Sequence, residues 1–211
     1  MTVPFALAAG LATLNNSQLV VAAGVAELVA GSISMGLGGF LSGYSDLEHY
    51  DAERKREKDE VERIPQMEEE ECYELLLPYG VRRESARPVI NDLMKNKELW
   101  VDFMMRFELN LEKPTMSHAW RSAFTIGISY FIGGALPLLP YINSNDTRIS
   151  LIYSAMVTIS ALFLFGYWKS KVMGVSSCLK SAIQMAFVGS LAAGSSFGVS
   201  VLINQALGLH M

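Results

Sequence analysis

The chain alternates between long apolar stretches and a single long polar one. Residues 18–44 form the clearest apolar stretch, because Glu27 is its only ionisable side chain before the closing Tyr44. Three further apolar stretches cover residues 119–140, 149–168 and 182–207. About 20 apolar residues in a helix cross the hydrocarbon core of a bilayer. The pattern therefore predicts four full transmembrane helices.

Residues 2–14 are also apolar but too few to cross a bilayer. We expect them to form the second half of a transmembrane helix whose first half is missing. Asn15 and Asn16 predict a turn, after which Ser17 is expected to cap the next helix.

The polar stretch, residues 46–114, predicts a small helical bundle. Its first part lacks an apolar stripe and should extend the preceding helix into water as far as Pro65. Three shorter helices are expected at residues 67–77, 84–96 and 97–109. The expected fold is all-α: a polytopic membrane protein with four full transmembrane helices, a partial first one and a cytosolic helical insert. The expected segments are residues 1–44, 45–117 and 118–211.

Composition and charge agree with a membrane location. The 211 residues are 51% apolar, and their mean hydropathy is +0.27. All but two of the 21 acidic residues and all but four of the 17 basic ones lie within residues 46–121. Arg148 is the only basic residue in a loop on the opposite side, so the positive-inside rule places the insert and residues 169–180 in the cytosol. Membrane lipids, and no nucleic acid, are the partners that this distribution predicts.

Glu27 and Met35 are the candidate chemical groups of the second apolar stretch. Together with Gly31 they are spaced by four residues, so they follow one slowly drifting stripe of a helix. Ionisable groups at membrane depth are costly and typically face a partner or a transport path. A path for a divalent cation is one interpretation. The other is a buried, hydrogen-bonded Glu27 with Met35 filling a gap.

The insert places carboxylates and thioethers at helical spacing. The pairs are Glu57 with Glu60, Glu68 with Glu71, and Met104 with Glu108. Like charges at such spacings weaken a helix, and a bound divalent cation would reverse that effect. A solvated acidic surface is the alternative. Cys72 and Cys178 form no C-x-x-C pair, so both are expected to be thiols that bind no zinc and form no disulfide.

Several segments together resemble the vacuolar iron transporter family of plants and fungi over nearly the whole chain. They are TVPFALAAGL, GVAELVAGSISMGLGGFLSG and the acidic insert ending in WVDFMMRFELNLEKP. The resemblance implies five transmembrane helices and a homodimer. It also implies transport of iron(II), and often manganese(II), from cytosol to vacuole in exchange for protons. The transport path would run between the first helices of the two subunits. By position, it assigns Glu27 and Met35 to the transport pathway. To the cytosolic metal-binding domain it assigns Glu57, Glu60, Glu68, Glu71, Met104, Met105 and Glu108.

The chain departs from this family at its first residue. Family members carry an Asp-Gly dipeptide before the segment that matches TVPFALAAGL, and its Asp is a metal and proton ligand. Here Met1 directly precedes Thr2. We therefore expect a sequence truncated at its amino terminus, which in this form transports poorly.

The resemblance thus implies a proton-coupled transporter of iron(II) in the vacuolar membrane. It predicts no enzyme activity and no cofactor besides the transported iron and the divalent metal that the cytosolic domain binds. A membrane-tethered metal-binding or interaction protein without transport is the alternative. A di-iron carboxylate enzyme would need Glu-x-x-His pairs, and no Glu stands three residues before His49, His118 or His210.

Overall fold

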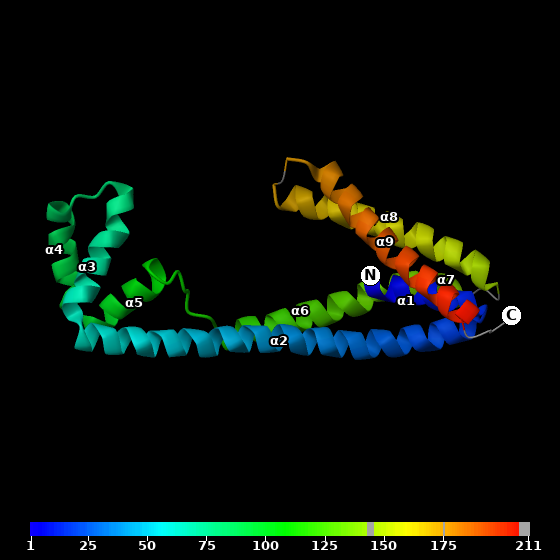
Figure 1. Cartoon of the computed structure of the whole chain (residues 1–211), viewed down its shortest axis with the longest axis horizontal. Coiled ribbons are helices and arrows are strands. Elements are labelled where there is room, and N and C mark those ends of the chain that lie inside the picture. Colours follow the sequence, from blue (N-terminus) through cyan, green and yellow to red (C-terminus); the bar gives the residue numbers. More distant parts are fainter. Residues whose placement is uncertain (143–145, 175, 207–211) are drawn as a thin grey trace. The chain divides into compact units, whose positions relative to one another are not determined.

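A computed structural model describes residues 1–142, 146–174 and 176–206 (Figure 1). The chain divides into two compact units, Met1–Leu37 with Ala123–Met211, and Gly38–Ser122. The expected insert, residues 45–117, falls within the second unit. Part of the expected loop 141–148, the expected helix end at Leu207, and His210 lie outside the described residues.

The first unit consists of apolar helices that pack pairwise. It contains α1 (Thr2–Leu11), the start of α2 (Ser17–Arg63), most of α6 (Met116–Ala135), α7 (Leu139–Ile142), α8 (Thr147–Val172) and α9 (Cys178–Ala206). The helices α8 and α9 pack along each other, and α1 packs on α9 (Figure 1). Phe5, Ala9 and Ala193 are buried where α1 meets α9. The outer faces carry exposed apolar side chains, as expected where lipid is the solvent.

Among the described residues, four helices are long and apolar enough to cross a membrane, and Thr2–Leu14 is a shorter apolar helical segment. Most of the described residues are helical, and none of them lies in a strand. The prediction of an all-α polytopic membrane protein is therefore confirmed. The predicted cap is wrong in one detail: the side chain of Asn16, not of Ser17, accepts the Leu19 N–H at 3.0 Å. Ser17 Oγ instead lies 2.9 Å from Thr147 Oγ1 on α8.

Glycines bring α2 and α6 close together within the first unit. A Cβ atom added to Gly127 would lie 3.0 Å from the carbonyl oxygen of Ser32, and one added to Gly36 would lie 3.1 Å from that of Ala123. Contacts this short mean that the two backbones touch almost directly. Small residues at such positions are the usual means by which membrane helices associate closely.

The second unit is a helical bundle around one apolar core. It contains the carboxyl-terminal part of α2, followed by α3 (Pro65–Leu76), α4 (Arg83–Met94), α5 (Lys97–Phe107) and the start of α6. Pro65 stands at the first position of α3, where its missing N–H costs nothing. Asn96 caps α5 by accepting the N–H groups of Glu98 and Leu99. The buried core consists of Tyr50, Val61, Cys72, Tyr73, Ala86, Ile90, Trp100, Val101, Met104 and Met105.

The sequence predicted that the carboxyl-terminal part of α2 extends alone into water. This prediction is wrong, because one face of that part is buried. Tyr50, Glu57 and Val61 are buried, with exposed fractions of 6%, 1% and 2%. This face escaped prediction because only two apolar residues and a carboxylate mark it. Arg54 on the same helix pairs with Glu98 and Asp102 of α5, each at 2.9 Å, which helps to hold α5 against α2.

Candidate metal centre and transport pathway

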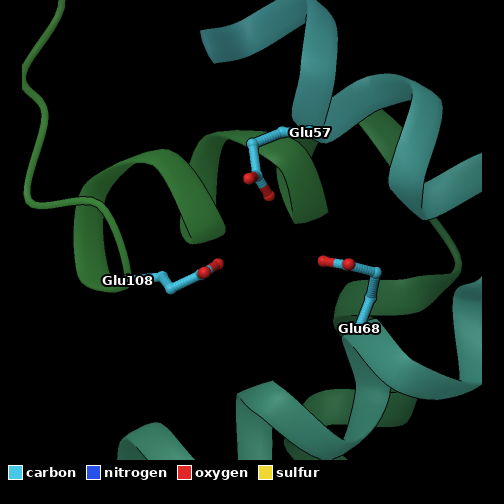
Figure 2. Close-up of side chains that lie close together, drawn as sticks. All are labelled: Glu57, Glu68 and Glu108. Atoms are coloured by element: carbon cyan, nitrogen blue, oxygen red, sulfur yellow. The ribbon is translucent and has the colours of Figure 1, made fainter.

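Three glutamates from three separate elements converge within the second unit. Glu57 comes from α2, Glu68 from α3, and Glu108 directly follows α5. One carboxylate oxygen from each lies within 4.8 Å of the other two. Figure 2 shows all three carboxylates turned toward a common point. Such a group of oxygen donors has the chemistry that hard and borderline divalent cations prefer.

Each of the three carboxylates has one oxygen without the hydrogen bond that a buried polar atom normally has. Glu57 is 1% exposed and Glu68 is 3% exposed. The Oε2 atoms of these two residues and of Glu108 are buried and have no hydrogen-bond partner within the described structure. Glu57 Oε1 lies 3.3 Å from the Arg56 guanidinium, which also contacts Glu53 and Glu60 at 3.2 and 3.4 Å. One exposed arginine thus faces several acids, leaving the cluster negatively charged when ionised.

Burial and mutual repulsion raise the pKa values of this cluster. Burial, followed by repulsion from neighbouring glutamates, raises the pKa of Glu68 to about 7. The same causes raise the pKa of Glu108 to about 7, and burial raises that of Glu57. A bound divalent cation would compensate both the burial and the repulsion, because it favours the ionised form of each carboxylate. Near neutral pH, the three carboxylates can therefore bind either protons or a divalent cation.

Glu60 and Glu71, which the resemblance also assigned to this domain, lie beside the trio. The side chain of Glu60 is 37% exposed and contacts Arg56. Glu71 is half-buried and close enough for its charge to raise the pKa values of Glu57, Glu68 and Glu108. Their roles as ligands stay predictions.

Three sulfur-containing side chains lie in the buried core of the second unit, namely Cys72, Met104 and Met105. Met104 and Met105 are 0% and 1% exposed. Cys72 Sγ lies 3.5 Å from Met104 Sδ, and the Trp100 indole donates to Cys72 Sγ at 3.3 Å. Burial raises the pKa of the Cys72 thiol to about 11. Sequence reasoning missed the contacts of Cys72 with Trp100 and Met104, because they join α3 to α5 and leave no local signal.

Glu27 has a partner that the sequence did not indicate. The Tyr130 hydroxyl of α6 donates to Glu27 Oε1, and Glu27 Oε2 is buried without a hydrogen-bond partner among the described residues. Gly31 makes room for this contact, since a Cβ atom there would lie 2.5 Å from Tyr130 Cε1. Met35, two helical turns further along α2, is 47% exposed in the single chain. The assignment of Glu27 and Met35 to one pathway stays a prediction.

Comparison with known proteins identifies the family of this chain. A profile described as "VIT family" matches residues 1–201. The chain belongs to the VIT family. It is 47% identical over 206 residues to vacuolar iron transporter 1 of Arabidopsis thaliana, an alignment that covers 97% of this chain and 82% of the relative. It is 46% identical over 201 residues to vacuolar iron transporter 1 of Oryza sativa subsp. japonica, covering 95% and 79%.

A fungal relative extends this similarity beyond plants. Protein CCC1 of Saccharomyces cerevisiae is 40% identical over 204 residues, covering 93% of this chain and 63% of the relative. Membership of the VIT family confirms the resemblance seen in the sequence. It places this chain among transporters rather than enzymes. Together with the vacuolar relatives and the four membrane-length helices among the described residues, it identifies a multi-pass protein of the vacuolar membrane.

Proposed function

We propose that this VIT-family chain transports iron(II) from the cytosol into the vacuole in exchange for protons, with manganese(II) as a second substrate. The observation that carries the proposal is the cluster of Glu57, Glu68 and Glu108, whose buried Oε2 atoms have no hydrogen-bond partner within the described residues. Burying such charges without compensation is costly. A substrate cation is the compensation that fits three converging carboxylates.

In this proposal the second unit collects the cation before transport. Glu57, Glu68 and Glu108 supply oxygen donors, Glu60 and Glu71 add negative charge, and Met104 and Met105 add thioethers. Oxygen donors alone would suit calcium or magnesium, whereas thioether sulfur favours softer ions such as iron(II). The combination of carboxylate oxygens and thioether sulfur atoms therefore favours binding of iron(II) over the abundant hard cations.

Glu27 and Met35 form the proposed pathway in the first unit. Glu27 retains one oxygen without a partner among the described residues, so this oxygen can hold either a proton or the cation in turn. Met35 is half-exposed on a membrane helix. We infer that a second copy of the chain faces Met35, so that the pathway is completed in a homodimer.

Uptake by reconstituted vesicles tests the proposal. The purified full-length protein should accumulate iron(II) in vesicles with an acidic interior and do so slowly when no pH gradient is imposed. Glu27→Gln keeps the shape of the side chain but removes its titratable charge, and should abolish the stimulation by the gradient. Glu74→Gln, an exposed glutamate outside the cluster, is the matched control.

The same preparation separates transport from mere binding. A membrane-tethered metal-binding protein would bind iron(II) in detergent yet show no uptake above protein-free vesicles. That result would overturn the proposal of transport while leaving the metal centre in place. Absence of binding would overturn the metal centre itself.

A further inference from the structure

Cys72 and Met104 form a contact between sulfur atoms that the proposed function does not use. The Cys72 thiol donates to Met104 Sδ at 3.5 Å, and the Trp100 N–H donates to Cys72 Sγ at 3.3 Å. Cys72 and Met104 are fully buried, and Trp100 is 2% exposed. The three buried side chains are thus linked by hydrogen bonds from the indole to the thioether.

Helical spacing relates these side chains to the carboxylate cluster. Cys72 follows Glu68 by four residues along α3, and Glu108 follows Met104 by four residues at the end of α5. Residues four apart lie on one face of a helix, with about 5–6 Å between their Cβ atoms. Both helices therefore place a sulfur atom one turn away from a carboxylate of the cluster.

The cluster itself indicates that a ligand binds there. Glu57 and Glu68 are more than nine-tenths buried, and their Oε2 atoms have no hydrogen-bond partner within the described residues. Figure 2 shows both carboxylates directed at each other and at Glu108. A cation held by these oxygens would lie near the turn that carries the Met104 thioether.

The Met104 sulfur must be held in one position if it is to serve as a metal ligand at this site. A methionine side chain has three rotatable bonds and fills irregular space, so its sulfur is poorly positioned by packing alone. A hydrogen bond from Cys72 restrains the sulfur by using one of its lone pairs and leaves the other one available. Partners of this kind orient metal ligands and tune their metal preference.

We propose that Cys72 is a positioning residue that holds the Met104 thioether toward the substrate cation and thereby sets the preference for iron(II) over manganese(II). The inference rests on the proposed function, because it takes Met104 as a ligand of the carboxylate site. Trp100 supports Cys72 by donating to its sulfur. Cys72 acts through Met104 and does not itself bind the cation. Its sulfur is absent from the described group of ligand atoms within 4.8 Å of one another, which comprises the three glutamates.

The test compares metal preference in the full-length protein in detergent. Calorimetry gives the dissociation constants of cobalt(II), an air-stable stand-in for iron(II), and of manganese(II). Cys72→Val puts an apolar side chain in place of the thiol and removes the S–H donor, and should lower the preference for cobalt over manganese about tenfold. Met104→Leu should lower it to the same extent, and the double variant should show no further loss. Such non-additivity identifies two residues that act as a unit.

Two controls separate positioning from general damage to the core. Ile90→Val shortens a side chain of the same core and should leave the preference unchanged. Met105→Leu alters the neighbouring thioether, and its effect should add to that of Cys72→Val. Trp100→Phe is a second variant for the case in which Cys72→Val does not fold. It removes the N–H donor and should shift the preference in the same direction.

Three results would overturn the inference. An intense thiolate-to-cobalt charge-transfer band in the parent protein would make Cys72 a direct ligand. A normal preference in Cys72→Val, with a reduced one in Met104→Leu, would remove Cys72 from the site but leave the proposed function standing. An unchanged preference in Met104→Leu would show that the thioether is no ligand, and the inference would fail together with that part of the proposed function.

Discussion

The Tyr130 hydroxyl donates a hydrogen bond to Glu27 Oε1, joining α6 to α2 across 103 positions of the sequence. The bond fixes one carboxylate oxygen and leaves the other buried without a hydrogen-bond partner in the described part of the chain. Tyr130 therefore orients the group that we propose to exchange protons for cations.

Replacing Tyr130 by Phe should reduce transport more than it reduces stability. A hydrogen bond between membrane helices contributes about 0.6 kcal/mol on average, so Tyr130→Phe should still fold. Without the donor, Glu27 loses its fixed orientation, and iron(II) uptake into acidic vesicles should fall. Uptake rates and the melting temperature of the same preparation are the two measurements. A variant with parental uptake would show that Tyr130 serves packing only.

Gly31 should tolerate no side chain, because a Cβ atom there would meet the Tyr130 ring at 2.5 Å. Overpacking of this kind costs about 1–3 kcal/mol. Gly31→Ala should therefore lower the melting temperature and displace the Tyr130 ring from Glu27. Gly38→Ala on the same helix is the control, since a Cβ atom there would meet nothing within 4 Å. Equal stability of the two variants would contradict this packing.

The carboxylate cluster should make stability depend on pH in the absence of metal. The pKa values of Glu68 and Glu108 are raised to about 7 from the usual value near 4.5. A raised pKa means that the folded state binds protons more tightly than the unfolded state. The stabilising effect is therefore complete below pH 4.5 and is lost as the pH rises through about 7. Glu68→Gln should raise the melting temperature of the metal-free protein at pH 8 but not at pH 5.

Cobalt(II) binding should show the opposite dependence on pH. Carboxylates must lose their protons to bind a cation, so affinity should rise from pH 5.5 to pH 8 and level off above the pKa of about 7. The double variant Glu57→Gln, Glu68→Gln should lose both binding and its pH dependence. Calorimetry at a series of pH values measures this directly. Binding that is strongest at pH 5 would exclude these carboxylates as ligands.

The orientation in the membrane can be tested with single cysteines. Ser176→Cys, in the segment between α8 and α9, should react with an impermeant maleimide from the cytosolic side of intact vacuoles. Gln18→Cys, in the first turn of α2, should react only from the lumenal side. A Cys178→Ser background removes the more accessible native thiol, while Cys72 is fully buried. The reverse labelling pattern would invert the direction proposed for transport.

Much of this fold follows from local patterns in the sequence. The membrane helices are predicted because each is a long apolar stretch, and Pro65 and Asn96 mark helix boundaries in the bundle. Glu57 and Glu68 could be nominated from their spacing and from the family resemblance. Their burial could not, because it depends on how α2, α3 and α5 pack against one another.

The contacts missed by sequence reasoning are all between separate helices. Tyr130 lies in an apolar stretch that offers no sign of its partner Glu27. Cys72 is separated from Trp100 by 28 positions and from Met104 by 32. The buried face of α2 carries too few apolar residues to form a recognisable stripe. Periodicity describes one helix at a time, and it cannot identify which helix supplies the neighbour.

Simultaneous recording of iron(II) and proton movement in the same vesicles tests the proposed exchange most directly. Vesicles that contain the full-length protein and an acidic, weakly buffered interior receive external iron(II), while one dye reports lumenal iron and another lumenal pH. Each increment of iron uptake should be accompanied by a rise in lumenal pH, and Glu27→Gln should lose both signals together. Iron uptake at constant lumenal pH, or a proton movement that persists in Glu27→Gln, would contradict coupled exchange through this carboxylate.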